Sequence, residues 1–270
     1  MSMQIIEFHF HQPPTIDYQA IRARASEILG SEIEMPEGEG DKAHLFAHVE
    51  HMVKFADGAA PPQTWLLEAE KSIDLEGYAG EIQQSWFCRD AESLLQGATH
   101  SLLVTEMLAQ TLEPQTRLEL FHGVVQAAAE QLEPLAMVAK HSQQVVLGQD
   151  YLDAVDQPPI KRPGSLNVRF FNISNTPGDM LMDTRGLTEI GLHDLQCHFR
   201  DLDPNDVSAV LFNTAIYVLE NGPVIESGQT IAGIDEGSKW DCQFENALVP
   251  PERQVLDLNP GAPHAAGGRE

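Results

Sequence analysis

Three histidines and a glutamate near the N-terminus have the side-chain types of a metal site. His44, His48 and His51 would share one face of a helix, a spacing that metal-binding histidines can use. On a strand, His44, His48 and Glu50 would share a face but spread over more than ~15 Å, too far for one ion. The segment also lacks the HExxH arrangement. We therefore predict no metal and no cofactor, and expect polar side chains on an edge element.

A second set of reactive side-chain types lies in the C-terminal half. Asp183, Arg185, His193 and Asp194 form a polar cluster between apolar runs, and Cys197 follows closely. A cysteine nucleophile needs an imidazole within about 3 Å, but His193 and Cys197 would lie about 13 Å apart on one strand. We therefore favour an interpretation in which Asp183 and Arg185 fix a turn and Cys197 fills the core. No residue is predicted to be catalytic.

Two groups of carboxylates could instead bind a basic partner. One lies in a glycine-bearing loop at residues 31–41, and the other lies in the turn at residues 201–206. Because charged loops are solvated in most proteins, their position on the surface is expected whether or not a partner exists. The predicted partner-binding residues are Glu32, Glu34, Glu37, Glu39, Asp41, Asp201, Asp203 and Asp206.

The overall charge favours a protein partner over other classes of ligand. The 270 residues include 16 Lys and Arg against 41 Asp and Glu, so the net charge is −25. This charge repels phosphate backbones and anionic lipids, so neither nucleic acid nor a membrane is expected as partner. A basic protein would be attracted and would associate faster at low salt. No P-loop, Rossmann glycine fingerprint or GxSxG elbow occurs in the sequence.

The N-terminus and the cysteines indicate an intracellular protein. The first twelve residues lack the basic and continuous apolar regions of a signal peptide. Cys88, Cys197 and Cys242 are widely scattered and have no CxxC spacing, so neither a disulfide framework nor a zinc site is indicated. We expect reduced thiols and a cytoplasmic location.

Strand and helix patterns alternate along the chain and predict an α/β (α+β) fold. Two related halves are expected, each a mixed or antiparallel sheet flanked by helices. The predicted division is an N-terminal half at residues 1–156, a Pro-rich connection at 157–164, a C-terminal half at 165–249 and an irregular tail at 250–270. The strongest predicted elements are strands at 3–10, 63–67, 101–105, 166–173, 180–183 and 193–199, and helices at 15–29, 113–132 and 203–219. Residues 44–55 are ambiguous between strand and helix.

Three short matches suggest that one unit is duplicated. Leu-Glu-Pro at 112–114 and Leu-Asp-Pro at 202–204 begin the two long helices, and Leu-Phe recurs at 120–121 and 211–212. A Ser-x-Gln step follows each helix, at 142–144 and 227–229. Their common order predicts a pseudo-twofold arrangement of two copies.

Longer runs resemble an uncharacterised bacterial family that is defined by a domain of unknown function. The runs are LMDTRGLTEIGLHDLQCHF, LDPNDVSAVLFNTAIYVLENGPVIESGQTI, QQSWFCRDAESLLQGATHSLLVTEML and HSQQVV, and the similarity spans roughly residues 5–231. The family has no established catalytic residues. Some of its members resemble immunity proteins encoded beside type VI secretion effectors.

The resemblance implies a non-catalytic immunity protein that neutralises a cognate toxin, expected to be a basic nuclease. A nuclease cleft attracts phosphate, so a strongly acidic protein is suited to cover it. Two alternatives stay open. One is an enzyme that uses residues 183–198 on a small substrate, and the other is an adaptor of a secretion apparatus.

Overall fold

The computed structural model describes residues 3–36, 42–56, 58–69 and 74–267. The chain divides into two compact units, a first unit at Met1–Ser165 and a second unit at Leu166–Glu270. Within the described residues the strands form three sheets accompanied by helices, which confirms the predicted α/β (α+β) class. None of the described helices combines the length and apolarity needed to cross a bilayer.

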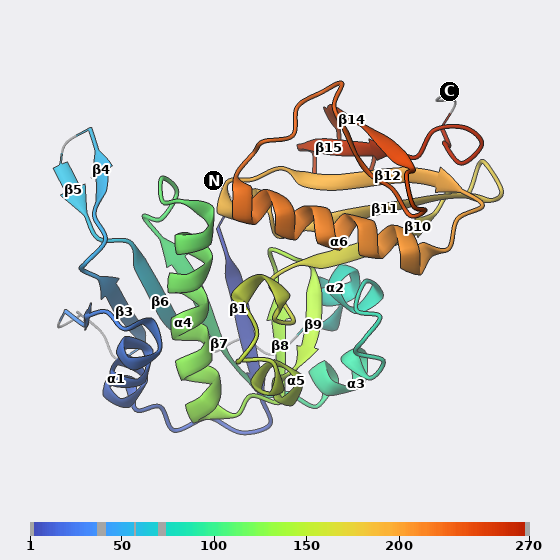
Figure 1. Cartoon of the computed structure of the whole chain (residues 1–270). Helices are drawn as coiled ribbons and strands as arrows, with labels where there is room; N and C mark the ends of the chain where they lie inside the picture. The colour runs from blue at the N-terminus through green and yellow to red at the C-terminus, as the bar shows by residue number, and fades with distance from the viewer. Residues whose placement is uncertain (1–2, 37–41, 57, 70–73, 268–270) are drawn as a thin grey trace. The chain divides into compact units, whose positions relative to one another are not determined.

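The first unit is built on a seven-stranded antiparallel sheet in the order β2-β3-β6-β7-β1-β8-β9 (Figure 1). The first strand of the chain lies inside this sheet, between β7 and β8, so both of its partner strands are distant in the sequence. A separate hairpin, β4-β5, extends from the chain between β3 and β6. The strands are β1 (Ile5–Phe10), β2 (Ile33–Glu34), β3 (Ala43–His48), β4 (Val53–Phe55), β5 (Gly58–Ala60), β6 (Gln63–Ala69), β7 (His100–Met107), β8 (Ala136–Ala139) and β9 (Gln144–Leu147).

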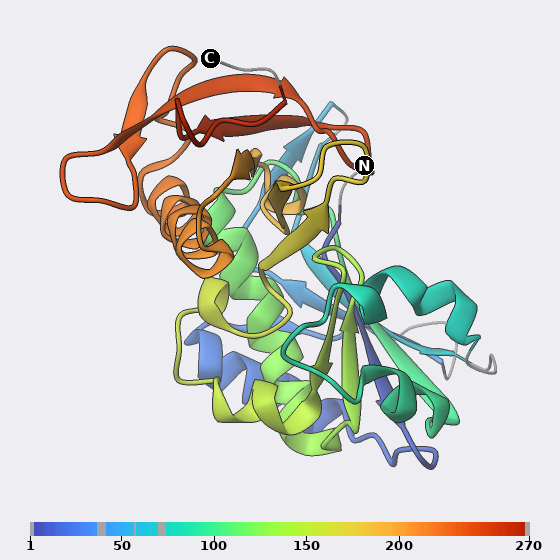
Figure 2. The same cartoon turned by 90° about the vertical axis from the view of Figure 1, so that its right-hand side faces the viewer.

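Helices cover both faces of this sheet (Figure 2). Ile6, Phe8 and Phe10 alternate along β1 and pack with the helices α1 (Tyr18–Leu29) and α4 (Pro114–Leu132). The opposite face of β8 packs against the short elements η1 (Leu75–Tyr78), α2 (Ala79–Gln83) and α3 (Ala91–Gln96). Because each buried aromatic or aliphatic side chain contributes about 1.5–3 kcal/mol, the alternation along β1 fixes which face each helix covers. The unit ends with α5 (Gly148–Asp153) and η2 (Pro159–Lys161).

The second unit contains a six-stranded sheet in the order β10-β11-β12-β15-β14-β13. All neighbouring strands are antiparallel except β12 and β15, which are parallel. The helix α6 (Pro204–Asn221) corresponds to the helix predicted at residues 203–219, and it buries Val207, Leu211 and Val218. The strands are β10 (Asn167–Asn172), β11 (Asp179–Arg185), β12 (Asp194–Arg200), β13 (Thr230–Ala232), β14 (Lys239–Asn246) and β15 (Gln254–Asn259), and η3 (Thr188–Ile190) connects β11 to β12.

The expectation of an irregular tail is wrong for residues 254–259. These residues form β15, which lies inside the sheet between β12 and β14. Val255, Leu256 and Leu258 are buried, and so is Asp257 between them. The buried aspartate breaks the apolar run that marks an interior strand, and the neighbouring Pro and Gly residues add to the appearance of a loop.

The two units share one series of strands followed by a long helix, although the first unit has other elements before and within this series. In each, three strands that are neighbours in an antiparallel sheet precede a long helix, as β3-β6-β7-α4 and as β10-β11-β12-α6. Both helices have a proline in the first turn, but Asp203 caps α6 by accepting a hydrogen bond from Asn205 N, whereas Glu113 makes no side-chain cap. The strands after the two helices differ. The Ser-x-Gln step overlaps the start of β9, the second strand after α4, but lies directly before β13, the first strand after α6. The similarity is therefore limited to the meander and the helix.

Gly148, at the start of α5, provides a test of packing in the first unit. A Cβ at this position would lie 1.7 Å from the carbonyl oxygen of Pro134, and this backbone atom cannot move aside as a flexible side chain could. We expect Gly148→Ala to lower the free energy of unfolding by about 1–3 kcal/mol, as overpacking does. Urea denaturation measures this loss. The control Gly80→Ala in α2 adds a Cβ with no atom within 4 Å, and equal stabilities of the two variants would contradict the predicted clash.

Candidate functional site

The polar cluster predicted from the sequence lies on one face of the second unit's sheet. Leu195 and Leu256 line a small cavity together with Val218 of α6, so their side of the sheet faces the helix. Side chains alternate along strands, so Gln196 and Asp257 lie on the opposite face. Strand pairing then places four polar residues in a row across β10, β11, β12 and β15, namely Arg169, Asp183, Gln196 and Asp257. All four are buried.

Asp183 is at the centre of this row and is held by two arginines. Its side chain is fully buried. Arg169 forms a fork with both carboxylate oxygens, with Nε donating to Oδ1 at 2.8 Å. Arg253 Nη2 donates to Oδ2 at 2.7 Å. A buried carboxylate is stable only with such charged donors, so these bonds compensate the cost of removing Asp183 from water.

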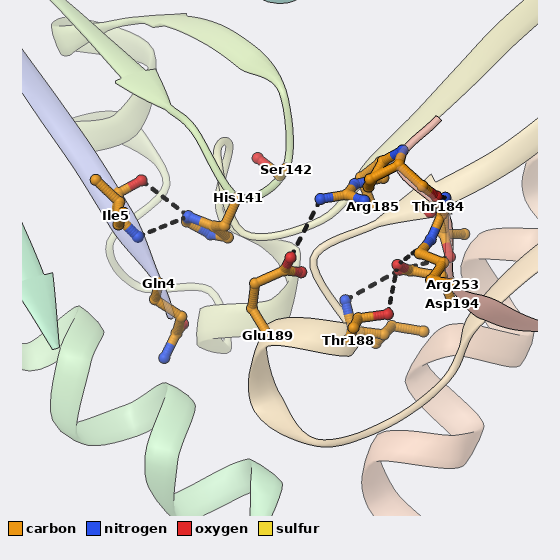
Figure 3. Close-up of polar contacts among 12 residues, drawn as sticks. Gln4, Ile5, His141, Ser142, Thr184, Arg185, Thr188, Glu189, Asp194 and Arg253 are labelled. Carbon is orange, nitrogen blue, oxygen red and sulfur yellow. Dashed lines mark hydrogen bonds and ion pairs between the residues drawn. The ribbon is translucent and has the colours of Figure 1, made fainter. Parts of the chain in front are cut away.

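Arg253 also reaches Asp194, the first residue of β12 (Figure 3). Through its bonds to Asp183 and Asp194 it joins the two carboxylates. Arg253 Nε donates to Asp194 Oδ2 at 3.0 Å. Thr188 Oγ1 donates to the same oxygen at 2.8 Å, while Thr184 Oγ1 and Leu187 N donate to Oδ1 at 3.2 Å. Both oxygens of Asp194 therefore accept two hydrogen bonds each.

A loop at residues 247–253 covers this polar face. Leu248 N donates to Gln196 Oε1 at 2.9 Å, and Gln196 Nε2 donates to Asp257 Oδ1 at 3.1 Å. Arg169 Nη2 donates to the carbonyl oxygen of Pro250 at 3.0 Å. The amide of Gln196 thus connects the loop to β15, and two backbone polar groups of the loop, Leu248 N and the Pro250 carbonyl, are satisfied by the residues beneath it.

Arg185, the last residue of β11, forms an ion pair with Glu189 (Figure 3). Arg185 Nη2 donates to Glu189 Oε1 at 3.1 Å. Burial raises the pKa of Glu189 to about 7, although the positive charge of Arg185 opposes this shift. Burial also lowers the pKa of the Arg185 guanidinium from its ordinary value. The pair is a buried ion pair with a carboxyl group that can titrate near neutral pH.

His193 does not join the other three residues of the predicted cluster. It precedes β12 and lines the cavity beside α6 together with Leu195, where its ring lies 4.8 Å from the ring of Phe244. The neighbouring Asp194 points to the other face because side chains alternate. Cys197 is fully buried, as expected of a core residue. The expectation that Asp183 and Arg185 fix a turn is wrong, because both residues lie in β11.

The predicted partner-binding carboxylates that the structure describes lie on the surface. Glu32 and Glu34 are exposed in the first unit, and Asp201 and Asp206 are exposed in the second. Asp203 is exposed as well and caps α6. The remaining three members lie outside the described residues: Glu37, Glu39 and Asp41.

The three histidines of the first unit have separate environments. His44 lies on β3 and stacks on the ring of Tyr18 at 3.4 Å. His48 is buried at the end of β3 and shares a hydrogen bond with Thr64 Oγ1 at 3.0 Å, while His51 follows in the next turn. Across residues 3–36, 42–56, 58–69 and 74–267, no group of three or more His, Cys, Asp or Glu side chains could hold a metal ion.

A buried arrangement of His122, Tyr151 and Ser165 was not predicted from the sequence. His122 Nδ1 lies 3.0 Å from Tyr151 Oη, and Nε2 lies 2.9 Å from Ser165 Oγ. The three residue types are those of a nucleophilic site, but the Ser165 hydroxyl donates to the carbonyl oxygen of Pro159. Burial holds the pKa of His122 well below its usual range. The group therefore ties α4 to α5 and η2, and no local sequence pattern could reveal it because its members are 29 and 43 positions apart.

A second unpredicted group includes Glu7 of β1, Tyr78 of η1, Glu81 of α2 and Lys140, which follows β8. Tyr78 Oη donates to Glu7 Oε2 at 2.8 Å, and the Nζ of Lys140 lies 3.8 Å from the centre of the Tyr78 ring. Lys140 Nζ also donates to Glu81 Oε1 at 3.0 Å. Burial raises the pKa of Tyr78, and the hydrogen bond to Glu7 raises it further. These contacts connect η1 and α2 to the sheet.

The comparisons with known proteins give one partial match. A family model described as a domain of unknown function (DUF4261) matches residues 183–259. The matched segment runs from within β11 to the end of β15 and contains Asp183, Asp194, Arg253 and Asp257. No curated protein and no solved structure matches the chain.

Arg253 provides the test of the buried network. We expect Arg253→Met to lower the free energy of unfolding by about 3–5 kcal/mol, because it leaves two buried carboxylates with too few charged donors. Chemical denaturation of the full chain measures the loss.

Arg24→Met is the matched control, since it removes the same charge from an arginine that is 47% exposed and pairs with Glu130. Such a pair is worth about 1 kcal/mol or less. If Arg253→Met lowers the free energy of unfolding no more than Arg24→Met does, the network does not hold the second unit together.

The burial of His48 should make the stability of the first unit depend on pH. Burial lowers the pKa of His48 from 6.5 to about 4, and the nearby His51 lowers it further. Below pH 6.5 the unfolded chain takes up a proton that the folded chain does not, so stability falls as the pH falls toward 4.

Wild-type protein and His48→Gln are compared by urea denaturation at pH 7.5 and pH 5. The variant cannot protonate at this position, so it should lose less stability between the two values, by up to about 1.4 kcal/mol per pH unit. A pH-independent difference between the two proteins would show that His48 does not contribute.

Proposed function

We propose that this protein is a non-catalytic immunity protein that binds and neutralises a basic protein toxin. A nuclease effector of a type VI secretion system is the toxin we expect. The observation that carries the proposal is the net charge of −25, together with the exposed carboxylates of both units. Catalysis has no part in this function, because binding alone occludes the toxin.

The negative charge of this protein is suited to binding a toxin that itself binds nucleic acid. A nuclease cleft presents Lys and Arg side chains to phosphate groups. The same cations attract the carboxylates of an acidic protein. Exposed carboxylates speed the encounter, whereas affinity comes from a smaller number of well-packed contacts. Glu32, Glu34, Asp201 and Asp206 are exposed and can contribute to this attraction.

The state of the polar cluster supports a binding role over an enzymatic one. Asp183 and Asp194 are fully buried, and all four of their carboxylate oxygens accept hydrogen bonds. A general base or nucleophile must reach its substrate, and these carboxylates are instead engaged by the protein itself. We therefore regard the cluster as scaffold.

Co-expression with the product of the neighbouring gene tests the proposal. We expect the two to co-purify at low salt, and we expect cells that produce the toxin to survive only when this chain is present. The association rate should fall by roughly tenfold or more between 50 mM and 500 mM NaCl, because the screening length shortens. Absence of both complex and rescue would rule out the immunity function.

Charge-reversal variants identify which carboxylates steer the encounter. Glu32→Lys with Glu34→Lys alters the first unit, and Asp201→Lys with Asp206→Lys alters the second without touching the helix cap at Asp203. The pair that contacts the toxin should lower the association rate with little effect on the dissociation rate. If neither pair changes the rate, the attraction comes from carboxylates elsewhere.

A further inference from the structure

The second unit carries a hollow of about 500 Å³ between α6 and β13. Val210, Asn213 and Tyr217 line it from the helix, Val224 lines it from the following loop, and all three residues of β13 line it from the sheet. Every lining residue belongs to the second unit. Its size lies within the range of ligand-binding clefts, about 300–1,000 Å³.

Strand β13 is at the edge of the sheet, and its free side faces away from β14. Gly233 N donates to the carbonyl of Ser238, and Cys242 N donates to the carbonyl of Gln229. Since hydrogen-bonded positions alternate, Ile231 bonds with β14, while Thr230 and Ala232 direct N–H and C=O groups to the free side. In the described part of the chain, no other strand pairs with β13. The free edge is thus a template for one more strand.

Two large apolar side chains are exposed beside this edge. Tyr217 is 49% exposed and Val224 is 47% exposed, and both line the hollow. Tyrosine is enriched at the centres of protein interfaces because it buries a large rigid area and keeps a polar tip. The hollow therefore offers apolar contacts for side chains, next to backbone groups that select an extended chain.

The chain segments that line the hollow carry acidic residues nearby in the sequence. Between residues 220 and 241 the chain has five carboxylates and one cation, Lys239. Glu226, Asp235 and Glu236 are exposed on both sides of β13 along the chain. This imbalance favours a segment that carries Lys or Arg. The carboxylates involved are Glu220, Glu226, Asp235, Glu236 and Asp241.

We propose that the groove between α6 and β13 binds an extended, basic segment of a partner protein, which adds to β13 as a further strand. Its backbone pairs with Thr230 and Ala232, its alternate apolar side chains enter the hollow beside Tyr217 and Val224, and its cations meet the surrounding carboxylates. This inference rests on the proposed protein-binding function and names the site where it takes place.

The first experiment uses a peptide as probe with the full-length protein. The peptide is acetyl-Lys-Val-Thr-Val-Lys-Val-Lys-amide, and amide hydrogen exchange is followed by NMR. Strand addition should slow exchange at Thr230 and Ala232, because their N–H groups become hydrogen bonded. A version with Glu in place of Lys and a version with methylated backbone nitrogens should leave exchange unchanged. Unchanged exchange with the basic peptide, or equal protection by all three, would overturn the proposal.

The second experiment blocks the edge. Ala232→Pro removes an N–H group that does not bond to β14, so the sheet is preserved while strand addition is prevented. Asn172→Pro is the matched control on β10, at the opposite edge of the same sheet, where residue 172 also directs its N–H away from its neighbour. We expect peptide binding to weaken about tenfold or more with Ala232→Pro and to be unchanged with Asn172→Pro.

Tyr217→Ser gives a second variant that does not depend on the backbone, because an exposed side chain can be shortened without unfolding the helix. It should weaken peptide binding as well, and equal binding by Ala232→Pro, Tyr217→Ser and wild type would overturn the proposal. A concentration-dependent dimer that Ala232→Pro abolishes would assign the groove to a second copy of this chain, and would overturn it too.

The outcomes separate this inference from the proposed function. If the toxin complex forms and both variants bind the toxin as wild type does, the groove is not the docking site, although the immunity function stands. If the peptide protects Thr230 and Ala232 but no toxin complex or rescue is found, the groove binds strands and the immunity function is wrong.

Discussion

The guanidinium of Arg253 is the interaction on which the second unit depends. It joins Asp183 of β11 to Asp194 at the start of β12, and it lies directly before β15. A single arginine therefore fixes two strands and the entry of a third. Because an unpaired buried carboxylate is costly, slipping any of these strands by one residue would turn a charged group toward the apolar side and be rejected. The contact of Arg253 with Asp194 also brings together the starts of β12 and β15, which are parallel.

Buried and exposed charges have different tasks in this protein. The buried ones, such as Asp183 with Arg169, are engaged by partners and hold strands in register. Exposed carboxylates such as Asp201 and Asp206 can attract positive charge at a distance, because the field of a charge extends beyond its direct contacts. A chain with a net charge of −25 can thus be stable in its interior and attractive at its surface. The free edge of β13 has a defined shape and direction, and it is here that we propose a partner segment binds.

Local patterns allowed much of the fold to be predicted. The alternation of Ile6, Phe8 and Phe10 predicts β1, and Leu118, Phe121 and Val125 predict the buried face of α4, because period-2 and period-3.6 burial are properties of the residues themselves. Strand β15 escaped prediction because Asp257 interrupts its apolar run, and its partner Gln196 lies 61 positions away. The position of β1 inside the sheet was also out of reach, since strand order depends on contacts between distant segments.

By itself the sequence determined the class of fold, the two long helices, the acidic surface and the presence of a polar group around Asp183 and Asp194. Only the tertiary structure decided what this group does. It brought Arg169 and Arg253 to the carboxylates from 14 and 70 positions away and directed His193 to the other face. It also left β13 as an edge beside α6. The reason is physical: periodicity and charge are local, whereas the pairing of a buried charge and the exposure of a strand edge depend on which distant segments the core brings together.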